Sequence, residues 1–172
     1  MIADRWGVTD DETAVPFACD RHVPEHPALA AWRGVDVAAD AAVVWRWVGQ
    51  IRQAPYSYDW IDNLGRRSPR RPLGLPEPVP GEPFTRCAGR PVGEVLEVDP
   101  GRELTGRILG AVMSYRVEAV APARSRLLLK IVMPRWRALA PAVAVGDLVM
   151  ARKQLLTWKA LAEREQIERV RP

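Results

Sequence analysis

The sequence predicts an α+β fold in which a curved antiparallel sheet of about six or seven strands wraps around one long C-terminal helix, with short helices after the first strand. Three observations predict it. Apolar residues recur at helical spacing in two segments, 44–51 and 148–162. Between Glu82 and Met133 they alternate instead, as in strands with one buried face. The links between these strands are short, which is typical of an antiparallel meander.

The length and composition predict a single domain that spans residues 1–172. Its 172 residues, 48% hydrophobic and 27% charged, are ordinary for a globular domain. Residues 1–30 carry early acidic residues and scattered prolines, so we expect an irregular N-terminal arm there. No apolar run is long enough to cross a bilayer, and a signal peptide is not recognisable, so we expect a cytoplasmic protein without a membrane span. Cys19 and Cys87 lie far apart in the chain and fit a reducing compartment.

The basic side chains are mostly arginines, and their densest cluster lies at 66–71. The formal net charge is only +4, and prolines follow the cluster where a nucleic-acid-binding surface would have stacking aromatic residues. We therefore expect an exposed, stiff loop and no nucleic-acid partner.

Cys19, His22 and His26 in the arm have a spacing that zinc ligands use. A structural zinc site normally needs four protein ligands, and the chain has no other histidine and no second cysteine nearby. We predict no metal site, and a lid or packing role for this segment.

The first regular elements that the sequence predicts are a strand at Arg33–Val37 and a helix that opens near Asp40. Val35 and Val37 alternate with smaller or polar neighbours, and a carboxylate is favourable at a helix N-terminus. The buried stripe of this helix comprises Val44, Trp47, Val48 and Ile51, and Trp45 lies off it.

The strands of the meander follow a stretch of loop. They are predicted at Pro83–Cys87, Val92–Val98, Glu103–Leu109, Met113–Val120 and Leu127–Met133. The buried face of the last two is formed by Met113, Tyr115, Val117, Ala119, Leu127, Leu129, Ile131 and Met133. The opposite face, with Leu128, Lys130 and Val132, is expected to be the more exposed one.

The long C-terminal helix is predicted to start at Gly146, with Asp147 as its cap. Its buried stripe comprises Leu148, Ala151, Leu155, Trp158 and Ala162, and Val149 and Leu156 widen the apolar arc on one side. Lys159 and Glu163 are spaced to form an ion pair.

The stretch Tyr56–Gly65 is the most unusual part of the chain, because three aromatic side chains and two carboxylates occur within ten residues. Two interpretations stay open. In one, Asp59 caps a turn that begins at Trp60, Gly65 ends it, and Trp60, Ile61 and Leu64 are core residues. In the other, the stretch forms a pocket wall whose tyrosine, tryptophan and aspartate side chains contact a ligand.

Arg152 is the second residue that the pattern singles out, because it projects into the apolar arc of the C-terminal helix. A charge on such a face costs free energy unless it is paired. It could form an ion pair with Asp59 or Asp62, bind a carbonyl or carboxylate of a ligand, or extend its head group to solvent.

In its order of elements and in several motifs, the chain resembles the START-like, or SRPBCC, superfamily, and within it the actinobacterial-type proteins described as polyketide cyclase/dehydrase-like. The resemblance rests on Arg33–Val37, Val44–Trp47, Tyr56–Arg66 and Gly146–Leu156. It implies a helix-grip fold with a cavity between the sheet and the C-terminal helix. It also implies a largely apolar ligand, polyketide-like or lipid-like, and no metal or redox cofactor.

Two functional hypotheses follow. The protein is an enzyme that cyclises or dehydrates such a ligand, as a lyase, or it is a non-catalytic carrier or sensor with the same pocket. No Ser-His-Asp set, dinucleotide-binding motif or phosphate-binding loop occurs in the sequence. An enzyme would therefore use Asp59 or Asp62 as its base, with Tyr58 and Arg152 orienting an oxygen atom. The expected ligand-binding residues are Trp47, Tyr56, Trp60, Met113, Tyr115, Leu129, Ile131, Met133, Val149 and Leu156. The chain is expected to be a monomer or a homodimer.

Overall fold

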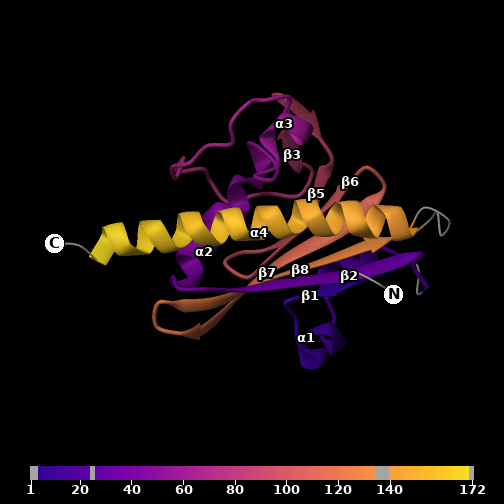
Figure 1. The fold of residues 1–172 in the computed structure, drawn as a ribbon, viewed down its shortest axis with the longest axis horizontal. Coiled ribbons are helices and arrows are strands. Elements are labelled where there is room, and N and C mark those ends of the chain that lie inside the picture. Colours follow the sequence, from indigo (N-terminus) through magenta and orange to yellow (C-terminus); the bar gives the residue numbers. More distant parts are fainter. Residues whose placement is uncertain (1–3, 24–25, 135–139, 171–172) are drawn as a thin grey trace.

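A six-stranded mixed sheet separates the long C-terminal helix from the N-terminal arm, as Figure 1 shows. The computed structural model describes residues 4–23, 26–134 and 140–170, with residues 140–148 as backbone only. The strand order is β1-β2-β8-β7-β6-β5. These strands are β1 (Arg5–Trp6), β2 (Leu29–Val37), β5 (Glu94–Asp99), β6 (Glu103–Ile108), β7 (Ala111–Ala121) and β8 (Arg124–Met133). The predicted fold class is confirmed.

The meander from β5 to β8 is antiparallel throughout, as the short turns predict. Only β1, which the sequence did not predict, runs parallel to its neighbour β2. In the β7–β8 register Tyr115 lies opposite Leu129 and Met113 opposite Ile131. These four side chains therefore share the sheet face that the C-terminal helix covers.

Two strand predictions needed correction. The first long strand begins at Leu29 rather than Arg33. Both of its faces are covered, so the alternation of polar and apolar residues is lost at its start. The predicted strand Val92–Val98 is divided at Gly93, whose φ of 72° bends the backbone. Its first part belongs to a separate hairpin of β3 (Thr85–Cys87) and β4 (Arg90–Val92).

The N-terminal arm packs on the sheet face opposite the C-terminal helix. Besides β1 it contains helix α1 (Asp10–Ala14) and the 3-10 helix η1 (Ala18–His22). The cluster under the arm consists of Phe17, Cys19, Val112, Leu128 and Val132. The expectation that Leu128, Lys130 and Val132 are exposed is therefore wrong, because the arm covers them.

Buried charges fasten the arm to the sheet. Arg116 lies 4.0 Å from the centre of the Phe17 ring and 2.8 Å from the Glu103 carboxylate. Glu103 also accepts a hydrogen bond from the backbone N–H of Ala18. Lys130 pairs with Asp20 of η1 at 2.6 Å. The arm is thus a structural layer of the domain, held by charge-assisted hydrogen bonds over an aromatic anchor.

Helix α2 (Ala41–Gly49) starts as predicted, directly after Asp40, and continues into η2 (Gln50–Arg52). The Asp40 carboxylate does not cap the helix. It accepts hydrogen bonds from the backbone of Ala123 and the side chain of Gln166 instead. The predicted stripe Val44, Trp47, Val48 and Ile51 is buried, and Trp45 is buried too, with its indole N–H donating to Glu77 of the proline-rich loop.

Helix α4 (Ala140–Val170) begins six residues before the predicted Gly146, because a proline such as Pro141 is tolerated in the first turn of a helix. The side chains of Asp147 and Leu148 lie outside the described part. Ala151, Leu155, Trp158 and Ala162 are buried as predicted. Lys159 pairs with Glu163 at 2.6 Å, as their spacing predicts. Neither α4 nor another helix of the described segments combines the length and apolarity that a membrane crossing requires.

The apolar arc of α4 widens on the side opposite to the predicted one. Val149 and Leu156 are exposed, whereas Gln154, Thr157 and Leu161 are buried. Two of these three are polar, so hydrophobicity alone pointed to the wrong side of the helix.

The arm leads to a stability prediction. Replacing Phe17 with Ala should lower the free energy of unfolding by about 3 kcal/mol, because it empties the anchor site beneath Arg116. Denaturant-induced unfolding measures this change. The matched control is Val15→Ala on the exposed side of the arm, which should cost less than about 0.5 kcal/mol. Equal effects of the two replacements would contradict the structural role of the arm.

Candidate functional site

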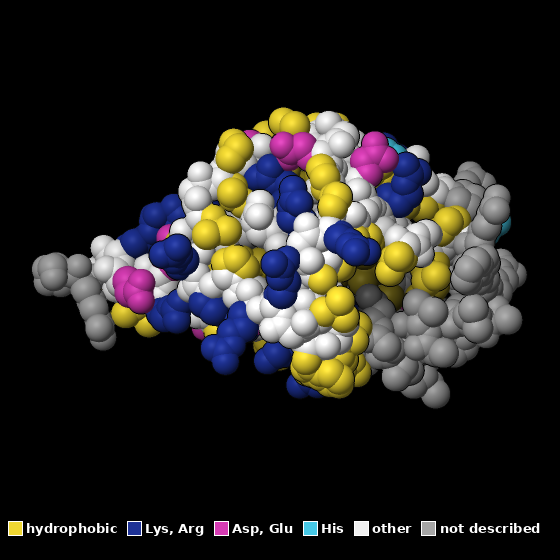
Figure 2. Space-filling view, turned by 90° about the horizontal axis from the view of Figure 1, so that it is seen from above, with side chains coloured by type: hydrophobic (Ala, Val, Ile, Leu, Met, Phe, Trp, Pro, Cys, Tyr) yellow, Lys and Arg dark blue, Asp and Glu magenta, His cyan; other side chains and the backbone are white. Residues whose placement is uncertain are grey.

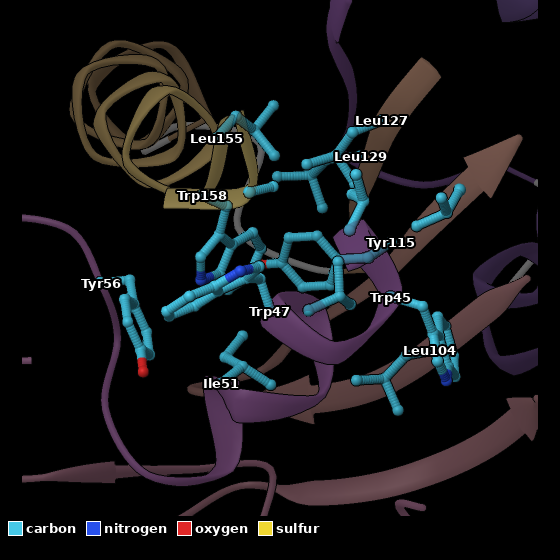
Figure 3. Close-up of a cluster of buried hydrophobic side chains, with 14 of the residues drawn as sticks. Trp45, Trp47, Ile51, Tyr56, Leu104, Tyr115, Leu127, Leu129, Leu155 and Trp158 are labelled. Carbon is cyan, nitrogen blue, oxygen red and sulfur yellow. The ribbon is translucent and has the colours of Figure 1, made fainter. Parts of the chain in front are cut away.

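An aromatic cluster holds α4 away from the concave side of the sheet. Trp158 of α4 points between Tyr56, Trp47 and Tyr115 (Figure 3), with its ring centre 5.9 Å from that of Tyr56 and 5.2 Å from that of Tyr115. Hydrogen bonds fix two of the partners. The Trp47 indole donates to Glu165 at 2.8 Å, and the Gln50 amide donates to the Tyr56 hydroxyl at 2.7 Å. The four large rings form a rigid spacer, in which the Trp47–Tyr56 and Tyr115–Trp158 pairs pack edge to face and the Tyr56–Trp158 pair is tilted.

A cavity of about 260 Å³ adjoins this spacer, between the sheet, α4 and the loops after η2. The surface view in Figure 2 shows a hollow lined by hydrophobic side chains on this side of the molecule. The described lining residues are Ile51, Pro55, Ser57, Asp62, Phe84, Thr85, Cys87, Ile108, Leu109, Met113, Tyr115, Leu129, Ile131, Met150, Ala151 and Gln154. The lining is mostly apolar, as is usual for a small-molecule site.

The hydroxyl groups in the lining all donate to acceptors of the protein itself. Ser57 donates to the carbonyl of Met150 at 3.0 Å, and Thr85 to that of Ile51 at 2.7 Å. The Tyr115 hydroxyl donates to the side-chain oxygen of Gln154 at 2.6 Å. Gln154 in turn donates to the carbonyl of Pro55 at 2.6 Å. These bonds satisfy the polar groups and connect α4 to both walls of the cavity.

Asp62 differs from the other polar residues of the lining. Both of its carboxylate oxygens are buried and neither has a hydrogen-bond partner among the described residues. Burial raises the pKa of Asp62 to about 6, and the negative charge of Asp59 adds to the increase. The backbone of Asp62, the Ser57 hydroxyl and the backbone of Tyr58 lie close enough to lower this pKa in part, although none forms a hydrogen bond of normal geometry with the carboxylate. The Ser57 proton is directed at the Met150 carbonyl. The site therefore holds a carboxylate without a well-formed hydrogen bond, and its pKa is raised to about 6.

Helix α3 (Asp59–Asp62) carries this carboxylate into the cavity. The N-cap residue is Tyr58, so the predicted cap at Asp59 is wrong by one residue. The helix ends one residue earlier than the predicted Gly65 implies, because Leu64 follows the C-cap Asn63 with a φ of 48°. Gly65 comes next with a φ of 80° and donates its N–H back to the Asp59 carbonyl. The exposed fraction of Trp60 is 73%, and Ile61 and Leu64 are also exposed, so their predicted core role is wrong. They project from the solvent side of this short helix.

Asp59 has a structural task. Its carboxylate accepts hydrogen bonds from both the backbone N–H and the hydroxyl of Ser68. The Ser68 hydroxyl oxygen then accepts the backbone N–H of Tyr56, whose φ of 57° is rare for a residue other than glycine. This chain of contacts fixes the turn that delivers Tyr56 to the aromatic cluster. Asp59 and Tyr58 do not line the cavity within the described part of the chain.

Arg152 lies on the outside of α4 and is not part of the cavity lining that the structure describes. Its guanidinium stacks over the ring of Trp6 at 5.1 Å, which is a cation–π contact with β1. Of the three alternatives for Arg152, the ion pair with Asp59 or Asp62 is therefore wrong. The error arose because the apolar arc was predicted to widen toward Leu156. That side of α4 is exposed, and Arg152 lies on it.

The predicted ligand-binding residues fall into four groups. Met113, Tyr115, Leu129 and Ile131 line the cavity. Trp47 and Tyr56 are buried in the aromatic cluster, and burial raises the pKa of Tyr56 to about 12. Trp60, Val149 and Leu156 are exposed, and Met133 is partly buried at the strand end, outside the described lining.

Sequence reasoning missed the wall formed by the 3-10 turn and the β3 hairpin, which includes Ile51, Phe84, Thr85 and Cys87. It also missed Gln154. The available signal was that Gln154 lies three residues after Ala151 and four before Trp158, where a polar residue beside a buried stripe needs hydrogen-bond partners. Among the described residues, no three potential metal ligands come together; Cys19 is buried under the arm and His22 lies 3.4 Å from Glu97.

The fold is similar to several solved structures, although no family model and no curated protein matches the sequence. A hypothetical protein from Helicobacter pylori matches with a TM-score of 0.55 and 15% identity, over 87% of this chain and 96% of the other. A protein from Arthrobacter aurescens matches with a TM-score of 0.53 and 16% identity, over 80% of this chain and 87% of the other. These likenesses support the helix-grip arrangement. They say nothing of a ligand.

A weaker match is the di-domain ARO/CYC protein BexL of the BE-7585A biosynthetic pathway. Its TM-score is 0.45 at 14% identity, and the match covers 81% of this chain and 46% of BexL. A similarity of this level has no bearing on activity.

The state of Asp62 predicts a pH-dependent effect of its replacement. Because the folded-state pKa lies above the unfolded value, the burial penalty is absent below about pH 4 and develops as the pH rises through about 6. Asp62→Asn should therefore raise the free energy of unfolding by about 1–2 kcal/mol at pH ~8 and leave it nearly unchanged at pH ~4.

Chemical denaturation at the two pH values measures this difference. The matched control is Asp99→Asn, an exposed carboxylate 3.5 Å from Arg102, for which we expect a change within about 0.5 kcal/mol at both pH values. A destabilised Asp62→Asn protein at the higher pH would show that the carboxylate has a favourable partner.

Proposed function

We propose that the protein binds a compact, largely apolar small molecule in the cavity between the sheet and α4. The observation that carries this proposal is an apolar cavity of about 260 Å³ with a single carboxylate that has no partner in the described part of the chain. A buried carboxylate without a partner lowers the stability of the folded protein. Such groups commonly occur in ligand-binding sites.

The size of the cavity limits the ligand. A dry cavity of ~150 Å³ takes up benzene, whereas pockets for drug-sized molecules start near 300 Å³. At about 260 Å³ the cavity suits a molecule of one or two rings. A full-length lipid or an extended polyketide chain would need a larger space. The resemblance of the sequence to START-like proteins and the helix-grip fold both support a ligand in this position.

Catalysis by Asp62 is the second candidate, because a carboxylate that titrates near neutral pH is suited to proton transfer. Cyclisation or dehydration of a ketone would also need a hydrogen-bond donor for the developing oxyanion. Tyr58 and Arg152 lie outside the described lining, and the hydroxyls of Ser57, Thr85 and Tyr115 already donate to protein acceptors. The arrangement thus supports binding better than catalysis of this type.

The binding proposal predicts uptake of the bicyclic hydrocarbon tetralin, measured by calorimetry. Ala151 lies in the wall of the cavity, so Ala151→Leu should fill part of the space and weaken binding about tenfold or more. The matched control is Ala160→Leu, at an exposed position of the same helix, which should bind tetralin like the native protein. Equal binding by both variants would exclude the cavity as the binding site.

A complementary measurement uses the free thiol in the cavity wall. Cys87 lines the cavity, whereas Cys19 is fully buried under the arm. Burial, followed by the charge of Asp62, raises the pKa of the Cys87 thiol, so its alkylation should be slow at neutral pH and faster at higher pH. Saturating tetralin should slow this alkylation, as followed by mass spectrometry, and an unchanged rate would argue against occupancy of the cavity.

A further inference from the structure

The cavity volume limits the size of the ligand, and the Asp62 carboxylate limits which polar group the ligand can carry. Asp62 presents two buried oxygens to a space whose other walls are nearly all hydrocarbon. A carboxylate in such a place is expensive unless hydrogen-bond donors or a positive charge compensate it. Such a group can come from the protein or from a ligand.

The described protein residues supply too little of this compensation: burial and the charge of Asp59 raise the pKa of Asp62 to about 6, although the backbone of Asp62, the Ser57 hydroxyl and the backbone of Tyr58 lower it in part. No lysine or arginine is among the described lining residues, and Arg70 lies 3.9 Å from the carboxylate of Asp59. The hydroxyls of Ser57, Thr85 and Tyr115 donate elsewhere. The titratable groups that face Asp62 are Asp59 on its own helix and Cys87 on the β3 hairpin, and the charge of either would repel a carboxylate.

We propose, on the basis of the binding function above, that the ligand is a compact one- or two-ring amine whose ammonium group pairs with Asp62. An ammonium group brings up to three donors and a positive charge, so it can satisfy both oxygens at once. A neutral hydroxyl brings one donor, and a ketone brings none and would leave the carboxylate unpaired. The hydrocarbon part of the amine then occupies the apolar space beside Tyr115, Leu129 and Ile131.

Pairing with a cation also determines the pH dependence. The ammonium group favours the ionised carboxylate, so an amine should bind more tightly as the pH rises through the titration of Asp62. A ketone that accepts a hydrogen bond from the protonated acid should show the opposite trend. Asp59 and Cys87 change the midpoint of this titration but not its direction.

The test compares four probes with one carbon skeleton: tetralin and its β-amino, β-hydroxy and β-keto derivatives. Dissociation constants are measured by calorimetry at pH ~5 and ~7.5, on either side of the Asp62 titration. The native protein, Asp62→Asn and the control Asp99→Asn are compared, with thermal unfolding to verify that each variant is folded. At the higher pH we expect the amine to bind at least about tenfold more tightly than tetralin in the native protein and the control. In Asp62→Asn, and at the lower pH, that preference should fall to about threefold or less.

The outcomes separate this inference from the proposed function. Binding of tetralin without a preference for the amine, or a preference that persists in Asp62→Asn, would overturn the amine assignment and leave the apolar cavity intact. Preference for the ketone, strongest at low pH, would also overturn it and would favour the acid–base candidate. Failure of all four probes to bind would overturn the cavity function itself, and the amine assignment with it.

Discussion

The wedge that Trp158 forms between helix and sheet is the contact on which the site depends. The ring packs against Tyr56 and Tyr115, while Trp47 is held in place from the end of α4 by Glu165. Aromatic side chains of this size keep α4 at a distance that smaller residues cannot fill. Two turns earlier the same face of the helix presents Ala151, and there the space stays open as the cavity. The change from large to small side chains along one helix face thus creates the cavity.

The two carboxylates of α3 show how local contacts separate similar residues. Asp59 accepts two hydrogen bonds from Ser68 and maintains the strained turn at Tyr56. Asp62, three residues later, turns toward the cavity and has no such bond among the described residues. One carboxylate therefore stabilises the scaffold, and the other is kept at the expense of stability. This division is typical of a site in which one group is reserved for an external partner.

The periodicity of the sequence was sufficient to predict the fold class, the meander and the buried stripe from Ala151 to Ala162, because alternation and helical spacing directly record which side faces the core. The periodicity failed where the N-terminal arm covers the second face of the sheet, because both faces are then buried and alternation no longer marks the exposed one. The arm buries Leu128 and Val132 on a face that the alternation marks as exposed, and it adds β1, which is too short for a pattern. Phe17 is a lone aromatic residue among acidic ones, and the sequence alone does not show what it contacts.

Part of the site was also predictable from the periodicity of the sequence. Met113, Tyr115, Leu129 and Ile131 follow from strand alternation and do line the cavity. The orientation of α3 does not follow from any period, because four residues complete only one turn, so Trp60 was assigned to the wrong environment. Arg152 was placed on the apolar face and Gln154 was given no role, because helical spacing does not show what a polar residue next to a buried stripe contacts. The partners of Gln154, the Tyr115 hydroxyl and the Pro55 carbonyl, are distant in the sequence.

The central claim is that Asp62 is an unpaired carboxylate in an apolar cavity. Its own titration in the ligand-free protein, followed by carbon NMR of its labelled side chain and assigned by its loss in Asp62→Asn, tests this claim most directly. We expect a midpoint at a pH of about 6, well above the ordinary value for an aspartate. A midpoint near or below about 4 would mean that the carboxylate is solvated or paired, and would contradict the account.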